Sequence, residues 1–222
     1  MTLRTILIVL LLGAMPVGAL AQESGASGEV AATSAEIAFD ASYRPSPSVS
    51  ARLQREFLTR IRWSAGVAAR DSLAAAFAER SPSEIWQELV EPDGLTTNNV
   101  VDALTAYWVL NWVAANGAYS LEIDSRPIQR QLRAAFAQDT TFHTLSDQQR
   151  QEMAEGYILN FLLEHAALNA ALEQQDVAAL TRLGTAATAR FRSQMKVDLL
   201  SVVPGPEGFV ARTKEDHNTP SD

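Results

Sequence analysis

The segment Val100–Asn116 is apolar on nearly every face of the helix that it predicts. A helix of this kind either lies inside a larger bundle or spans a membrane. The segment is shorter than the roughly 20 residues that a span needs, and it contains the polar residues Asp102 and Asn111. We therefore expect the chain to fold around this helix, with other elements covering it on all sides.

The rest of the chain predicts helices rather than strands. Apolar residues recur at helical spacing, as in the row Val49, Leu53, Phe57 and Ile61. Capping-box signals stand at Ser81 and Ser146, and no sustained alternation of period two is present, so no sheet is predicted. The predicted fold is all-α: a single bundle of about seven helices around the central apolar helix, over residues 47–211.

The first 21 residues have the order of a signal peptide. Arg4 precedes the aliphatic run Ile6–Leu12, and a small-x-small cleavage site follows at Ala19–Ala21. This order predicts export, with a periplasmic or secreted location and no transmembrane segment after cleavage. Residues 22–46 are rich in Ser, Ala, Gly and Glu and predict a disordered leader, and residues 212–222 predict a disordered tail.

Composition excludes several classes of function. The 222 residues carry a formal charge of -8 and no cysteine, which argues against a nucleic-acid partner, disulfides and thiolate metal sites. The common metal, nucleotide and serine-hydrolase motifs are absent, so we expect no metal and no cofactor. Of the three histidines, His165 has the residue type of a general base, but no nucleophile motif is near it, so we expect it in the core or at its edge, hydrogen-bonded to Asn169 one turn on.

A polar sector on the central helix leaves two interpretations open. Asn98, Asp102, Thr105 and Asn116 fall in one narrow sector, and three aromatic residues lie close by. These residues fit an ordinary core, with Asp102 bonded to backbone or to an arginine. They also fit a pocket for a small ligand, whose candidate binding residues are Asp102, Tyr107, Trp108 and Trp112.

Two charged groups of residues raise further hypotheses. Glu152 and Glu155 lie three apart on a long predicted helix and, with Asp102, have the residue type for acid–base hydrolysis of a glycan. Such hydrolysis requires the carboxylates to converge in one cleft. A basic stretch, Arg52, Arg55, Arg60 and Arg62 against Glu56 alone, has the charge to contact anionic lipid or polymer. Both groups are also typical of a solvated helix face.

Several stretches resemble a bacterial domain-of-unknown-function family, number 6683. They are Tyr43–Val49, Gly94–Leu95, Asn99–Trp108, Asn116–Gly117, Gln148–Glu155 and Gly208–Val210. The resemblance covers about residues 43–210. It implies an exported, mostly helical bacterial protein, and it implies no activity, ligand or catalytic residue.

Two functions from different classes follow from these observations. The first is a non-catalytic exported module that binds a protein partner or a small ligand in the bacterial cell envelope, where a protein or an envelope polymer is the expected partner. The alternative is a hydrolase, for example on cell-wall glycan, that uses Asp102, Glu152 or Glu155.

Processing after Ala21 is the first testable prediction. The intact mass of exported protein should correspond to a chain that begins at Gln22, because the small-x-small site ends there. Membrane-bound material that still begins at Met1 would contradict it.

Overall fold

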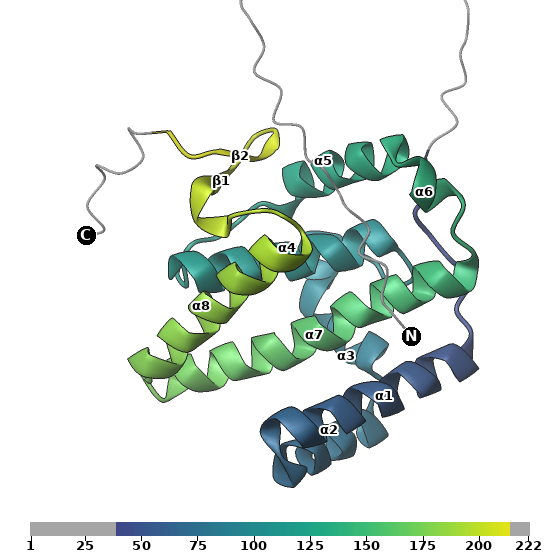
Figure 1. Cartoon of the computed structure of the whole chain (residues 1–222), viewed down its shortest axis with the longest axis vertical. Coiled ribbons are helices and arrows are strands. Elements are labelled where there is room, and N and C mark those ends of the chain that lie inside the picture. Colours follow the sequence, from purple (N-terminus) through teal and green to yellow (C-terminus); the bar gives the residue numbers. More distant parts are fainter. Residues whose placement is uncertain (1–38, 214–222) are drawn as a thin grey trace, which may run out of the picture.

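Helices account for most of residues 39–213, which are the part of the chain that this computed structural model describes (Figure 1). The α-helices are α1 (Pro47–Ala65), α2 (Val67–Glu79), α3 (Pro82–Val90), α4 (Val100–Asn116), α5 (Ser125–Gln138), α6 (Thr140–His143), α7 (Asp147–Glu173) and α8 (Val177–Gln194). The remaining elements are the 3-10 helices η1 (Glu91–Asp93) and η2 (Leu199–Ser201) and the strands β1 (Val202–Gly205) and β2 (Gly208–Ala211). The mostly all-α prediction is confirmed. The helix that exceeds the expected seven is the single-turn α6, which Asp139 caps.

Helix α4 is the centre of the bundle. Helices α5, α7 and α8 and the short η2 pack around it (Figure 1). Its start and end follow the sequence signals: the side chain of Asn99 accepts hydrogen bonds from two backbone N–H groups, and Gly117 ends the helix with a φ of 64°. None of the helices in the described part of the chain has the length and apolarity needed to cross a membrane.

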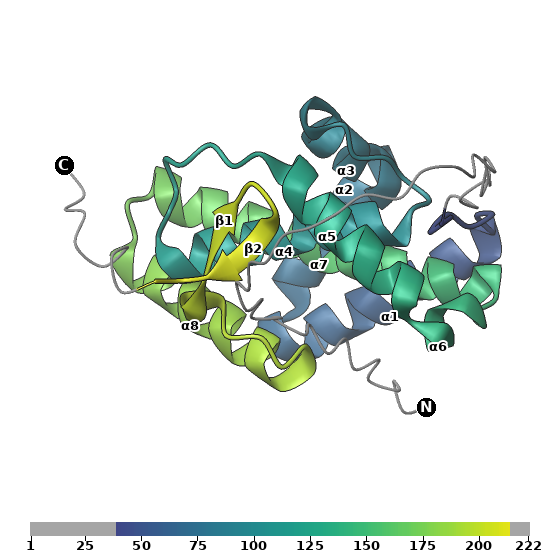
Figure 2. The same cartoon turned by 90° about the horizontal axis from the view of Figure 1, so that it is seen from above.

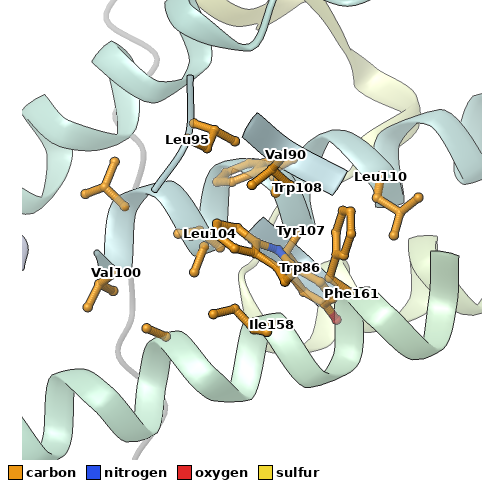
Figure 3. Close-up of a cluster of buried hydrophobic side chains, with 14 of the residues drawn as sticks. Trp86, Val90, Leu95, Val100, Leu104, Tyr107, Trp108, Leu110, Ile158 and Phe161 are labelled. Atoms are coloured by element: carbon orange, nitrogen blue, oxygen red, sulfur yellow. The ribbon is translucent and has the colours of Figure 1, made fainter. Parts of the chain in front are cut away.

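Helices α1 and α3 pack on α7, and α2 packs on α1. Helix α1 buries Phe57 and Ile61 and packs on α7, and α2 folds back along α1 after a turn at Gly66, whose φ is 93°. Helix α3 begins at the expected capping box and carries Trp86, whose side chain is fully buried. Figure 3 shows Trp86 in the same cluster as Tyr107 and other core residues.

The prediction that the chain forms no sheet was wrong. Strands β1 and β2 form an antiparallel hairpin that lies beside α5 (Figure 2). Each strand has only four residues, too few to show a clear alternation. The amide side chain of Gln131 on α5 supplies the missing edge partner: its Nε2 donates to the carbonyl of Phe209, and its Oε1 accepts from the N–H of Phe209, both at 2.9 Å.

Residues before the predicted boundary at residue 47 are part of the packed fold. Ala41 is fully buried, and the N–H of Tyr43 donates to the carbonyl of Asn98 at 3.0 Å. Such pairing uses backbone groups, so side-chain composition carries little sign of it. The predicted disordered leader, residues 22–46, is therefore too long, because residues 39–46 pack against the helices. The predicted signal peptide, residues 22–38 and residues 214–222 lie outside the described residues.

The crossing of α4 and α8 depends on a glycine. A Cβ atom at Gly184 would lie 2.6 Å from the carbonyl oxygen of Ala114, too close for the helices to keep their separation. Gly184→Ala should therefore lower the free energy of unfolding by about 1–3 kcal/mol in urea denaturation.

The matched control is Gly156→Ala in the middle of α7, where an added Cβ meets nothing within 4 Å. This variant should be as stable as the wild type or more stable by up to about 1 kcal/mol, because alanine favours helix. Equal stability of both variants would show that α4 and α8 do not pack as closely as described.

Candidate functional site

Asp102 is buried in the first turn of α4, and both of its carboxylate oxygens accept hydrogen bonds. The Nε2 of Gln129 donates to Oδ1 at 2.7 Å, and the backbone N–H and hydroxyl of Thr96 donate to Oδ2 at 3.0 and 2.8 Å. Its place near the helix N-terminus also favours a negative charge. The carboxylate joins α4 to α5 and to the preceding loop. Asp102 thus fits the interpretation of an ordinary core residue. Its partners are an amide, a hydroxyl and a backbone N–H, and no arginine is among them.

Tyr107 and Trp108 are core residues (Figure 3). The ring of Phe191 on α8 contacts both, with centroids 5.8 Å from Tyr107 and 5.6 Å from Trp108. Trp108 also stacks on Phe209 of β2 at 5.6 Å. These contacts bring α4, α8 and the hairpin together.

Trp112 is also buried, and its indole N–H donates to the carbonyl of Val202 at 2.8 Å. All four candidate ligand-binding residues, Asp102, Tyr107, Trp108 and Trp112, therefore lie in the interior with contacts from neighbouring elements. The geometry supports the core interpretation of this part of α4.

Glu152 and Glu155 are neighbours on α7, whereas Asp102 lies on α4, and each of the three carboxylates has its own partners. The carboxylate of Glu152 pairs with the guanidinium of Arg52 at 2.5 Å. Oε1 of Glu155 accepts from the hydroxyl of Ser50 at 2.6 Å and from Nε2 of Gln151 at 2.7 Å. The carboxylate of α4 has a third and separate set of partners, described above. Each group is held in its own network of hydrogen bonds.

The histidines form no metal site in the described residues, where no three His, Asp or Glu side chains could jointly hold an ion. His165 stacks on Phe161 with a centroid distance of 5.6 Å, and Nδ2 of Asn169 lies 3.4 Å from its Nε2. Burial lowers the pKa of His165, so the ring is neutral near pH 7. This is the place at the edge of the core that the sequence predicted.

A partly buried ion pair between α7 and α8 was missed from the sequence. An Nη2 of Arg190 donates to Glu164 at 2.9 Å and to the side-chain oxygen of Asn111 at 2.7 Å. The hydroxyl of Tyr107 donates to the same Glu164 oxygen at 3.4 Å. Burial raises the pKa of Glu164, and Arg190, Asn111 and Tyr107 oppose that effect in part. A small hollow of about 50 Å³ adjoins the pair.

The spacing of residues on α7 indicates that Glu164 lies on a buried face and needs a partner. Glu164 continues a row of Tyr157, Phe161 and Leu168 that follows one face of α7 at intervals of three and four residues. A charged residue within such a row predicts either a break in the buried face or a buried partner. Arg190 on α8 is that partner.

A groove of about 780 Å³ runs along α8, between the end of α4 and η2. Its walls are formed mostly by Ala, Gly, Thr, Val and Leu, together with Asn116 and Tyr119. Arg192, whose guanidinium pairs with Asp198 at 2.7 Å, is the charged residue of the lining. Val177 and Leu200 on the rim are 72% and 43% exposed. The sequence did not predict this groove, because it needs the relative placement of three elements.

None of the four candidate residues on α4 lines this groove or the small hollow. Asn116, which the sequence placed in the same polar sector, does line the groove, and its Oδ1 accepts from the guanidinium of Arg212 at 2.7 Å.

Fold and geometry define a mostly helical domain built on one buried helix, with an open, largely uncharged groove on its surface. Residues 7–212 match the model of the Family of unknown function (DUF6683), and the chain belongs to this family. No curated protein and no solved structure matches the chain. The family therefore agrees with the resemblance found in the sequence and assigns no chemistry to the groove.

The Glu164–Arg190 ion pair should give the protein a distinctive pH dependence. Because the folded state raises the pKa of Glu164, the stabilising effect of its protonated form is present below the ordinary carboxyl pKa and is lost as pH rises through the raised value. The free energy of unfolding of the wild type, minus that of Glu164→Gln, should therefore fall as the pH rises above the ordinary carboxyl pKa of about 4.3. Urea denaturation at a series of pH values measures this difference. A difference that is constant or grows with pH would contradict the assignment.

Proposed function

We propose that this chain is a non-catalytic binding module that is exported into the bacterial cell envelope, and that its groove along α8 binds an amphipathic helix of a partner protein. The signal-peptide order of residues 1–21 supports export. Asp102, Glu152 and Glu155 are each engaged by other side chains or backbone, and none of them lines the groove or the small hollow, so binding is favoured over catalysis.

The hydrogen bonding of the threonines in the groove carries the proposal. The hydroxyls of Thr181, Thr185 and Thr188 each donate to a backbone carbonyl one turn earlier in α8, at 2.8, 2.9 and 3.0 Å. These side chains therefore present methyl groups with their donors already satisfied. An apolar partner can cover them without leaving an unpaired polar group, which would otherwise oppose binding.

The shape of the groove favours a helix over a small ligand. The groove extends along α8 from Val177 to Arg192, which at the rise of an α-helix is roughly 22 Å. An occupant helix of about four turns matches this length. The small side chains of the walls let a second helix approach closely, and Val177 and Leu200 on the rim offer exposed apolar contacts.

A photo-crosslinking residue at Ala189, in the groove, tests the proposal in cells. It should give a discrete adduct with one protein, whereas the same residue at Ala134, exposed on α5, should not. The crosslinked segment of the partner is then synthesised as a peptide. The peptide should bind the purified module and gain helical circular dichroism on binding.

Thr185→Arg places a charge in the groove and should weaken binding of the peptide at least about tenfold, because the guanidinium loses water when the partner covers it. Ala134→Arg is the matched control and should bind the peptide as the wild type does. The proposal fails if Ala134 yields the same adduct, if no adduct forms, or if the captured segment binds in an extended form. Release of a small molecule from the groove, or glycan cleavage that Asp102→Asn abolishes, would favour the other functions instead.

A further inference from the structure

Trp63 is exposed, whereas the other three tryptophans are buried. Its side chain is 81% exposed in the last turn of α1, whereas Trp86, Trp108 and Trp112 are all less than 5% exposed. Val67, at the start of α2, is 50% exposed on the other side of the Gly66 turn. The turn between α1 and α2 therefore presents two large apolar side chains to its surroundings.

Arginines without acidic partners extend from the middle of α1 to its last turn. Arg55 and Arg62 are seven residues apart and lie on the face of α1 opposite the buried residues Phe57 and Ile61. The guanidinium of Arg62 lies 5.9 Å from the centroid of the Trp63 ring.

Arg60 is exposed as well, and it donates to the side-chain oxygen of Asn160 at 3.2 Å. Among the described residues, no carboxylate pairs with Arg55, Arg60 or Arg62. The nearest acidic residues in sequence, Glu56 and Asp71, are already paired with arginines, Glu56 with Arg52 at 3.1 Å and Asp71 with Arg70 at 3.0 Å. The exposed face of α1, from its middle to its last turn, is thus basic on a chain whose formal charge is -8.

We propose that the α1–α2 turn docks on the surface of an anionic lipid bilayer. Trp63 and Val67 enter the interfacial layer, and the guanidinium groups of Arg55 and Arg62 contact the phosphates of the headgroups. Tryptophan is enriched at this depth of a bilayer because its ring is apolar and its N–H is polar. Arginines near an anionic surface add electrostatic attraction.

Both the shape and the apolarity of the turn favour a bilayer over a soluble polyanion. The α1–α2 hairpin forms one edge of the molecule, remote from α5 and the β-hairpin (Figure 1). A polyanion would neutralise the arginines but would leave Trp63 and Val67 in water. A bilayer provides partners for the arginines and for the apolar side chains, since it has phosphates at its surface and an apolar layer beneath them.

Tryptophan fluorescence of the chain beginning at Gln22 tests the proposal, because the aliphatic run of the signal peptide would itself bind lipid. Vesicles of phosphatidylcholine containing phosphatidylglycerol should bind the protein and shift its emission to shorter wavelength. Vesicles of phosphatidylcholine alone should not. Since the other three tryptophans are already buried, the shift reports on Trp63.

Trp63→Ala should abolish the shift and weaken binding to the anionic vesicles at least about tenfold. The double variant Arg55→Gln/Arg62→Gln should weaken binding about 30-fold, because two surface arginines are lost. The matched controls are Leu121→Ala, which removes a side chain that is 56% exposed, and Arg182→Gln, which removes an exposed arginine on α8. Both controls should bind as the wild type does.

Three outcomes would overturn the proposal. The first is the absence of binding to anionic vesicles, and the second is equal weakening by the control variants, which would indicate non-specific adsorption. The third is arginine-dependent binding to dextran sulfate without any emission shift on vesicles, which would identify the surface as one for anionic polymer. Circular dichroism of each variant confirms that the fold is retained.

Discussion

The burial of α4 on every side is the constraint on which the rest of the structure depends. A helix with apolar residues all round gains free energy only if other elements cover each face, because any uncovered face leaves apolar surface in water. Helices α5, α7 and α8 and the short η2 supply that cover. The close approach of α8 is set by Gly184, which leaves no room for a Cβ atom beside the backbone of Ala114.

The polar side chains within α4 determine which elements cover which face. Asp102 accepts hydrogen bonds from α5 and from the loop before α4, whereas Asn111 accepts one from Arg190 on α8. Trp112 donates to the backbone of β1. A buried polar group without its partner costs free energy, so each of these contacts favours one placement of a neighbouring element over the alternatives. Residues that the sequence offered as ligand contacts thus act in positioning the fold.

Two surfaces remain after the core has formed, and they differ in chemistry. The groove along α8 is lined by small side chains and by threonines whose hydroxyls are bonded to backbone. The α1–α2 turn combines the exposed Trp63 with unpaired arginines. Because different helices form them, a variant on one surface leaves the other unchanged, and the two proposals can be tested independently in the same chain.

Local patterns in the sequence determined the helices of this protein: the caps at Ser81, Asn99 and Ser146 and the end of α4 at Gly117 are all where the residues predict them. These signals act within one or two turns, so they can be recognised without a partner. Tertiary structure alone decided the β-hairpin, the pairing of Ala41–Tyr43 with the start of α4, the Glu164–Arg190 pair and the groove. Each of these joins residues far apart in the chain, mostly through backbone groups or small side chains. The free energy that holds them comes from contacts that exist only once the helices have packed around α4.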